Sequence, residues 1–169
     1  MKLIAIAFAL AAASSSAIVR NWIEYNRPTA LTWKDFDPAL VRVMKGKADS
    51  IGVVLGHFYS KSSNDAAVLS KKGSRLIFEI VRCDPECVVD VHQDLTGGMA
   101  GTRYVAKELT YLTLVPKGSL VETSPAVESE NKHVNVKHDA VQVATFEKAA
   151  VVWYWDEKTK KWDTVSTAD

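Results

Sequence analysis

Apolar residues recur at every second position through most of the chain, and this alternation constrains the fold more than any other feature. Polar clusters rich in Ser, Asn, Asp and Gly separate the stretches that read as strands, which are residues 51–55, 66–69, 76–81, 88–92, 109–115, 140–146, 149–155 and 161–167. A period of two is typical of half-buried β-strands, whereas amphipathic helices repeat every three to four residues. The sequence therefore predicts a mainly β fold, an antiparallel meander or propeller-blade-like sheet.

Residues 37–46 break the alternation and predict one short helix near the N-terminus. Asp37 can cap the helix, and Pro38 suits its first position because proline has no N–H to leave unpaired. Gly46 suits the exit, where the backbone often takes a left-handed conformation.

The first residues carry the pattern of a secretory signal peptide. Lys2 supplies the positive charge, residues 3–13 are apolar and uncharged, and residues 14–17 are small. We predict cleavage after Ala17, with Ala13 as the second choice, which leaves residues 18–169 as a single mainly β domain in the periplasm or secreted. No membrane anchor is expected, because the apolar stretch is too short to span a bilayer. The alternative is a buried N-terminal helix.

Charge and cysteine content limit the classes of partner and cofactor. The net charge of +1 gives no basic excess for binding nucleic acid or anionic lipid. The cysteines Cys83 and Cys87 flank a tight turn, which predicts a disulfide in an oxidising compartment. A zinc site needs more ligands than this pair provides, so we predict neither a metal nor another cofactor. Unpaired buried thiols remain the alternative.

The C-terminal β-hairpin, residues 149–155 and 161–167, holds three of the five tryptophans. In an extended strand Trp153 and Trp155 share one face and Tyr154 lies on the other, so both faces carry bulky apolar side chains. With Trp162 they form the candidate binding site. The alternative is structural, with one face in the core and the other against a neighbouring segment, for which residues 21–25 are the nearest candidate within the chain.

Several short motifs are similar to those of a known family. They are HDAV at 138–141, FEK at 146–148, VWYWD at 152–156, Trp162 and the closing TAD at 167–169. Together they resemble the final module of small exported bacterial proteins related to FG-GAP/VCBS repeats. Upstream, GHFYSKSSNDAAVL at 56–69 resembles the Asp-rich loop of that repeat running into a strand.

The loop departs from the family at the positions that would bind calcium. The alternating ligand positions carry His57, Tyr59 and Lys61, and only Asp65 remains a carboxylate. Calcium takes six to eight oxygen ligands, and the lysine would add repulsion. We therefore expect a degenerate repeat without calcium, its loop held by hydrogen bonds and by packing of Phe58.

A weak catalytic candidate lies in the stretch 88–92 and just after it. Asp90, His92 and Asp94 alternate, so a regular strand would place all three on one face, as an acid–base or metal site requires. The alternative is a solvated strand face, which we favour because no nucleophile or fourth ligand lies nearby in the sequence.

These observations favour a non-enzymatic function. The first hypothesis is an exported accessory or protein-binding domain of the cell envelope, whose protein partner is unidentified. The second is a periplasmic inhibitor or immunity protein against a secreted hydrolase or toxin, which could insert the acidic loop bearing Glu122, Glu128 and Glu130 into a cationic cleft. A hydrolase that uses Asp90, His92 and Asp94 is a weaker third.

Overall fold

The fold is mainly β, as the alternation predicts. The computed structural model describes residues 15–84, 86–96, 107–123 and 133–168. It contains 49% strand and 18% helix, and its sheets are antiparallel.

The first four strands form one antiparallel sheet in chain order. They are β1 (Val53–Gly56), β2 (Asp65–Lys72), β3 (Arg75–Cys83) and β4 (Cys87–Asp94). Each strand pairs with the next one along the chain, so this sheet is a meander. Gly73, in the turn between β2 and β3, has a φ of 61°, which glycine adopts without strain.

The later strands form a second antiparallel sheet and a small flanking pair. The second sheet has the order β10-β9-β8-β5 and consists of β5 (Thr110–Val115), β8 (Ala140–Thr145), β9 (Ala149–Asp156) and β10 (Lys161–Ala168). The pair is β6 (Leu120–Glu122) with β7 (His133–Asn135). The alternation marks the longer strands correctly, but β6 and β7 are too short to produce a readable pattern.

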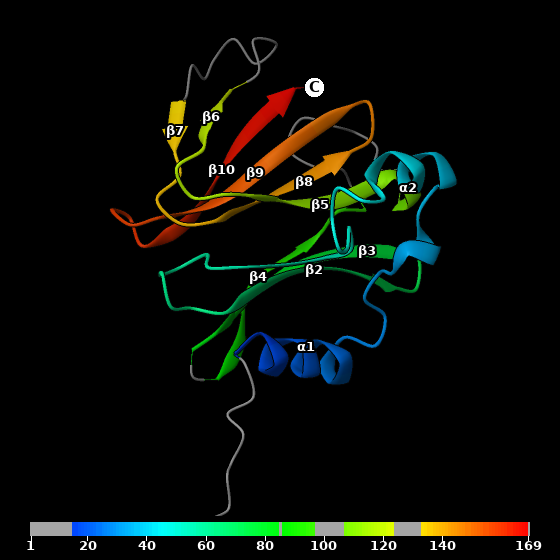
Figure 1. Cartoon of the computed structure of the whole chain (residues 1–169), viewed down its shortest axis with the longest axis horizontal. Helices are drawn as coiled ribbons and strands as arrows, with labels where there is room; N and C mark the ends of the chain where they lie inside the picture. Colours follow the sequence, from blue (N-terminus) through cyan, green and yellow to red (C-terminus); the bar gives the residue numbers. More distant parts are fainter. Residues whose placement is uncertain (1–14, 85, 97–106, 124–132, 169) are drawn as a thin grey trace, which may run out of the picture.

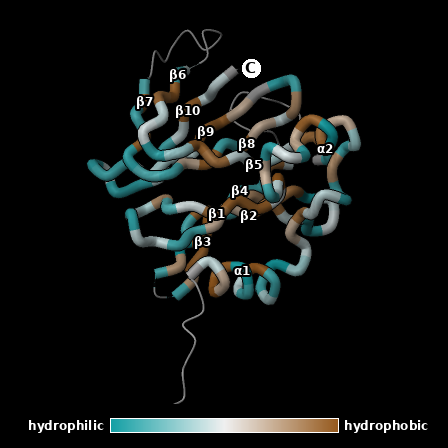
Figure 2. Tube along the Cα trace, viewed as in Figure 1, coloured by the Kyte–Doolittle hydropathy of each residue, from teal (hydrophilic) through white to brown (hydrophobic). Residues whose placement is uncertain are grey.

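The two four-stranded sheets lie one above the other and enclose the main core (Figure 1). Hydrophobic segments gather where the sheets face each other (Figure 2). Leu69 and Phe78 of the first sheet and Val143 and Val151 of the second all belong to this core. Burying each such side chain contributes about 1.5–3 kcal/mol, so the contact between the sheets is the main source of stability.

Strand β2 is buried on both of its faces. Leu69 faces the second sheet, whereas Ala66 and Val68 pack with Val19 and Ile23 of helix α1 (Ser15–Asn26). Helix α1 therefore covers the outer face of the first sheet, below it in Figure 1. This second cover explains why β2 reads as a continuous apolar run and not as a simple alternation.

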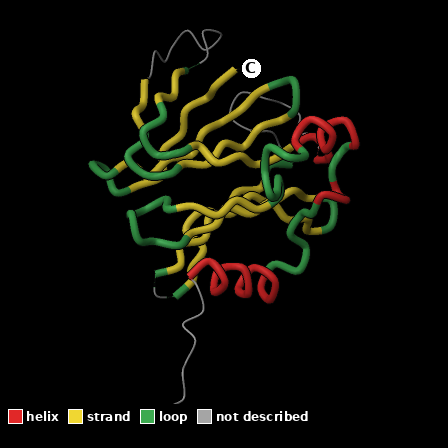
Figure 3. Tube along the Cα trace, viewed as in Figure 1, coloured by secondary structure: helices red, strands yellow, loops and turns green. Residues whose placement is uncertain are grey.

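The predicted short helix is present as α2 (Pro38–Met44), at one end of the sheets (Figure 3). Asp37 caps it, because its side chain accepts a hydrogen bond of 2.7 Å from the backbone N–H of Ala39. Gly46 follows with a φ of 88°. Two short 3-10 turns, η1 (Trp33–Asp35) and η2 (Lys107–Leu109), precede α2 and β5 respectively.

Residues 21–25, the candidate cover for the hairpin, lie within helix α1. Val19 and Ile23 are four residues apart, so they lie on one face of a helix and both are buried. Most of the predicted signal peptide, residues 1–14, lies outside the described residues. Among the residues that are described, no helix is long and apolar enough to span a membrane.

The predicted disulfide joins Cys83 to Cys87. The two residues pair directly across the end of the β3–β4 hairpin. The bond therefore links two strands that are already neighbours in the meander.

Replacing both cysteines by serine should lower the free energy of unfolding by about 2 kcal/mol, because the unfolded chain then gains the freedom of a short loop. Urea denaturation of the oxidised wild type and the double variant would measure the difference. Reduction of the wild type should reproduce the loss, and equal unfolding midpoints for all three samples would contradict the prediction.

Candidate functional site

The four aromatic candidates of the C-terminal hairpin divide into two structural and two surface residues. Trp153 packs in the main core with its ring centroid 5.5 Å from that of Phe78. Tyr154 points to the opposite face, is buried, and donates a hydrogen bond of 2.7 Å to Asp163. These two residues therefore stabilise the second sheet.

The cover over Tyr154 is not the segment that the sequence suggested. Residues 21–25 lie in α1, on the far side of the first sheet. Val121 and Val134, from β6 and β7, instead belong to the cluster around Tyr154 and Val152 (Figure 1). For Val152 and Tyr154, the segment that covers the face opposite the main core is therefore β6–β7.

The two remaining tryptophans form a partly exposed aromatic cluster with Tyr59. Trp155 and Trp162 are directly paired across β9 and β10, with ring centroids 6.1 Å apart. Tyr59 lies 4.6 Å from Trp155 and 5.3 Å from Trp162, centroid to centroid. The indole N–H of Trp162 donates a hydrogen bond of 2.6 Å to the Tyr59 hydroxyl. The three rings are therefore held in one arrangement.

The loop between β1 and β2 positions Tyr59. Its neighbour Phe58 is fully buried in the main core, and Gly56 provides the space, since a Cβ there would lie 2.5 Å from the Phe58 ring. Asp65, also buried, accepts hydrogen bonds from the backbone N–H groups of Phe58 at 2.8 Å and Tyr59 at 3.3 Å. Hydrogen bonds and the packing of Phe58 thus order this loop, as the sequence predicts.

A β-bulge in β4 brings Asp90 to the aromatic cluster. Val81 pairs with Val89 and Ile80 with Val91, so Asp90 is an extra residue between two pairs. Asp90 accepts a hydrogen bond from the Tyr59 hydroxyl and lies 3.6 Å from Arg82. Burial and the Asp90 carboxylate raise the pKa of Tyr59 above its ordinary value. The hydroxyl therefore stays protonated and keeps donating to Asp90.

The cluster borders an open groove between β4 and the β9–β10 hairpin, with a volume of about 520 Å³. The groove is lined by Asp90, Val91, His92, Trp155, Lys160, Lys161 and Trp162. We call it the aromatic groove. Sequence reasoning identified its tryptophans but not Tyr59, Lys160 or Lys161 as site residues, because Tyr59 comes from a loop about a hundred residues away and lysines in a turn carry no distinctive signal.

The three residues of the weak catalytic candidate do not share one strand face. We expected Asp90, His92 and Asp94 to share one strand face, but the bulge turns Asp90 toward Tyr59. His92 also lines the aromatic groove, but its Nδ1 lies 2.8 Å from Glu79, the residue directly opposite it on β3. Asp94 accepts a hydrogen bond from the backbone N–H of Thr96. Among the described residues, no group of three or more His, Cys, Asp or Glu side chains is placed to hold a metal ion.

The predicted acidic loop is only partly described. Glu122 is exposed in β6 and lies 3.4 Å from Nδ1 of His133 in β7. Glu128 and Glu130 lie outside the described residues, so the structure gives no arrangement of the three carboxylates.

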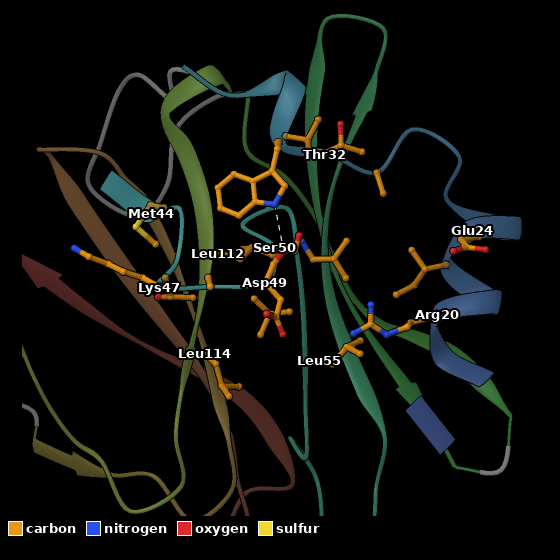
Figure 4. A pocket seen from close by; sticks show the side chains of 18 of the residues that line it. Arg20, Glu24, Thr32, Met44, Lys47, Asp49, Ser50, Leu55, Leu112 and Leu114 are labelled. Atoms are coloured by element: carbon orange, nitrogen blue, oxygen red, sulfur yellow. Dashed lines mark hydrogen bonds between the residues drawn. The ribbon is translucent and has the colours of Figure 1, made fainter. Parts of the chain in front are cut away.

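A larger cleft of about 840 Å³ lies beside the edge strands β1 and β5, at the opposite edge of both sheets (Figure 4). It is walled by α1 and by the segment after α2, and Trp33 donates a hydrogen bond of 3.2 Å to the backbone oxygen of Asp49 there. Its lining contains the basic residues Arg20 and Lys47 and the acidic residues Glu24 and Asp49. Four separate segments form this cleft, so no local sequence motif marks it.

Comparison with family models, with curated proteins and with solved structures found no match to the chain. The relation to FG-GAP/VCBS repeats remains a prediction from the sequence motifs.

Proposed function

We propose that this chain is an exported, non-enzymatic protein-binding domain of the cell envelope, and that it binds its partner at the aromatic groove. The observation that carries the proposal is the cluster of Tyr59, Trp155 and Trp162. These rings remain partly exposed although contacts within the chain fix their positions. The proposal concerns a binding surface, and no step of catalysis is assigned to it.

Fixed aromatic side chains are well suited to protein binding. Tryptophan and tyrosine provide large contact areas, and they are enriched among residues that dominate interface energy. A side chain already ordered in the free protein loses little conformational freedom on binding. The bond from Trp162 to Tyr59, and that from Tyr59 to Asp90, order the rings before a partner arrives.

Two further features support the compartment that we propose. The signal-peptide pattern of Lys2 and residues 3–13 is typical of export. A disulfide such as that between Cys83 and Cys87 is typical of proteins folded in an oxidising environment.

Affinity capture from cell-envelope extract tests the binding surface. Wild-type protein should recover a specific partner, and Trp155→Ala should recover at least about tenfold less of it, because the variant loses a central aromatic contact. The matched control is Tyr25→Ala, which removes an aromatic ring that is 86% exposed on α1 and does not line the groove. Circular dichroism should confirm that both variants fold.

Equal recovery by wild type and Trp155→Ala would exclude the aromatic groove as the interface. Equal loss in both variants would also count against it, because the effect would then not be specific to the groove. Recovery of a hydrolase or toxin, inhibited on binding, would support the inhibitor hypothesis instead.

A further inference from the structure

We infer that the partner presents an acidic segment to the aromatic groove, with carboxylates at Lys160 and Lys161 and an apolar side chain against Trp155 and Trp162. The inference rests on the proposed function and specifies the chemistry of the partner. It follows from how the charges around the groove are paired within the chain.

The carboxylates near the groove already have partners. Asp90 lies 3.6 Å from Arg82 and accepts the Tyr59 hydroxyl. Asp156 accepts hydrogen bonds from the backbone N–H of Lys158 at 2.9 Å and from the Thr159 hydroxyl at 3.0 Å. A basic segment would have to compete with these contacts, so the groove offers it little unpaired negative charge.

The remaining acidic residue of the β9–β10 turn is also engaged. Glu157 lies 2.6 Å from Nε2 of His138. The hydrogen bond from His138, helped by the charges of His138 and Lys160, lowers the pKa of Glu157. Glu157 is therefore ionised at neutral pH and directed toward His138.

The lysines differ from these carboxylates. Lys160 and Lys161 line the groove and are exposed. Within the described part of the chain, neither ammonium lies within ion-pair distance of a carboxylate. Lys160 occupies the left-handed region with a φ of 53°, and its backbone N–H is bonded to Asp156 at 2.8 Å. The turn backbone is thus ordered, while neither lysine ammonium is held in an ion pair with a described residue.

The tryptophans add a second requirement on the ligand. The indole N–H of Trp162 is bonded to Tyr59, whereas that of Trp155 has no acceptor among the described residues. An incoming carboxylate could accept from Trp155 and pair with a lysine, while an apolar group covers the rings. Charge-assisted hydrogen bonds of this kind are shorter and stronger than neutral ones. Acidic residues next to an apolar one therefore fit the groove best.

Selection from a display library of random twelve-residue peptides tests the inference without knowledge of the partner. Peptides enriched on the wild type should carry an excess of Asp and Glu. Their binding should weaken at least about tenfold on the double variant Lys160→Glu/Lys161→Glu and should also weaken with added salt. The matched control is Lys34→Glu/Lys45→Glu, which changes the net charge equally at exposed positions near α2 and should bind like the wild type.

Enrichment without an acidic bias, equal binding to the groove variant, or no enrichment at all would each overturn the inference. The capture experiment with Trp155→Ala is independent of this result. If that variant loses the envelope partner while the library shows no acidic bias, the groove is the interface but the partner chemistry inferred here is wrong.

Discussion

Replacing Asp65 by alanine should lower the free energy of unfolding by about 3 kcal/mol or more, because several buried hydrogen-bond donors then lose their acceptor. Besides the N–H groups of Phe58 and Tyr59, Asp65 accepts from the Ser63 hydroxyl at 2.6 Å and the N–H of Cys83 at 3.3 Å. The loop that holds Tyr59 would lose its anchor. Chemical denaturation monitored by circular dichroism measures the change.

Asp65→Asn is the control that separates hydrogen bonding from charge. One carboxylate oxygen accepts from Phe58, Tyr59 and Ser63, and an amide oxygen in its place can accept the same three bonds. The amide nitrogen in place of the other oxygen cannot accept from the Cys83 N–H, so Asn loses that one bond. Burial raises the pKa of Asp65, although hydrogen bonds from Ser63, Phe58, Cys83 and Tyr59 oppose the shift. The neutral amide avoids the cost of burying a charge. We therefore expect Asp65→Asn to lose much less stability than Asp65→Ala, and equal losses would contradict this account.

Removing the Arg27 side chain should have an effect of similar size, about 3 kcal/mol at neutral pH, because it leaves a buried carboxylate without its main partner. Arg27, immediately after α1, donates from two guanidinium nitrogens to Glu79 in β3, whose side chain is only 6% exposed. Arg27→Met keeps much of the aliphatic packing while removing the charge. Urea denaturation of the variant and the wild type measures the loss.

The size of this loss should depend on pH. Burial alone would raise the pKa of Glu79, but the hydrogen bonds and charges of Arg27 and His92 lower it below the ordinary 4.5. A lowered pKa in the folded state contributes stability above the ordinary value, and that stability disappears as the pH falls through the folded value. The difference between wild type and Arg27→Met should therefore be greatest near pH 7 and shrink in acid below about pH 4.

A double variant shows whether the ion pair itself is required. Arg27→Met/Glu79→Gln removes both charges, so it should recover part of the stability lost in Arg27→Met. The single variant Glu79→Gln gives the reference. If the double variant loses as much stability as Arg27→Met and Glu79→Gln lose together, the two side chains are not coupled and this account is wrong.

The fold was predictable where local pattern determines structure. Each alternating stretch became a strand, and the cap at Asp37 with the glycine at 46 set the bounds of α2. Helix α1 was missed because residues 21–25 are too few to distinguish the period of two of a strand from the period of 3.6 of a helix. The longer spacing of Val19 and Ile23, which the sheet buries, decides in favour of a helix.

The candidate site was predictable only in part, for a different reason. Trp155 and Trp162 are conspicuous in the sequence. They are partly exposed because they lie beside the turn that joins β9 to β10. Trp153, two residues from Trp155, is instead packed against Phe78. Tyr59 and Asp90 join the site through a loop and a bulge. Such irregularities arise from tertiary contacts and leave no periodic signal in the sequence.

The bulge at Asp90 also bears on the open edge of the first sheet. Strand β4 is an edge strand, and its Val88 and Val89 are 45% and 36% exposed, which makes this edge the natural place for another chain to add a strand. Such addition needs an uninterrupted row of backbone groups in regular register. The extra residue breaks that row beside the two valines and adds a charge, so the feature that shapes the groove also protects the molecule from edge-to-edge aggregation.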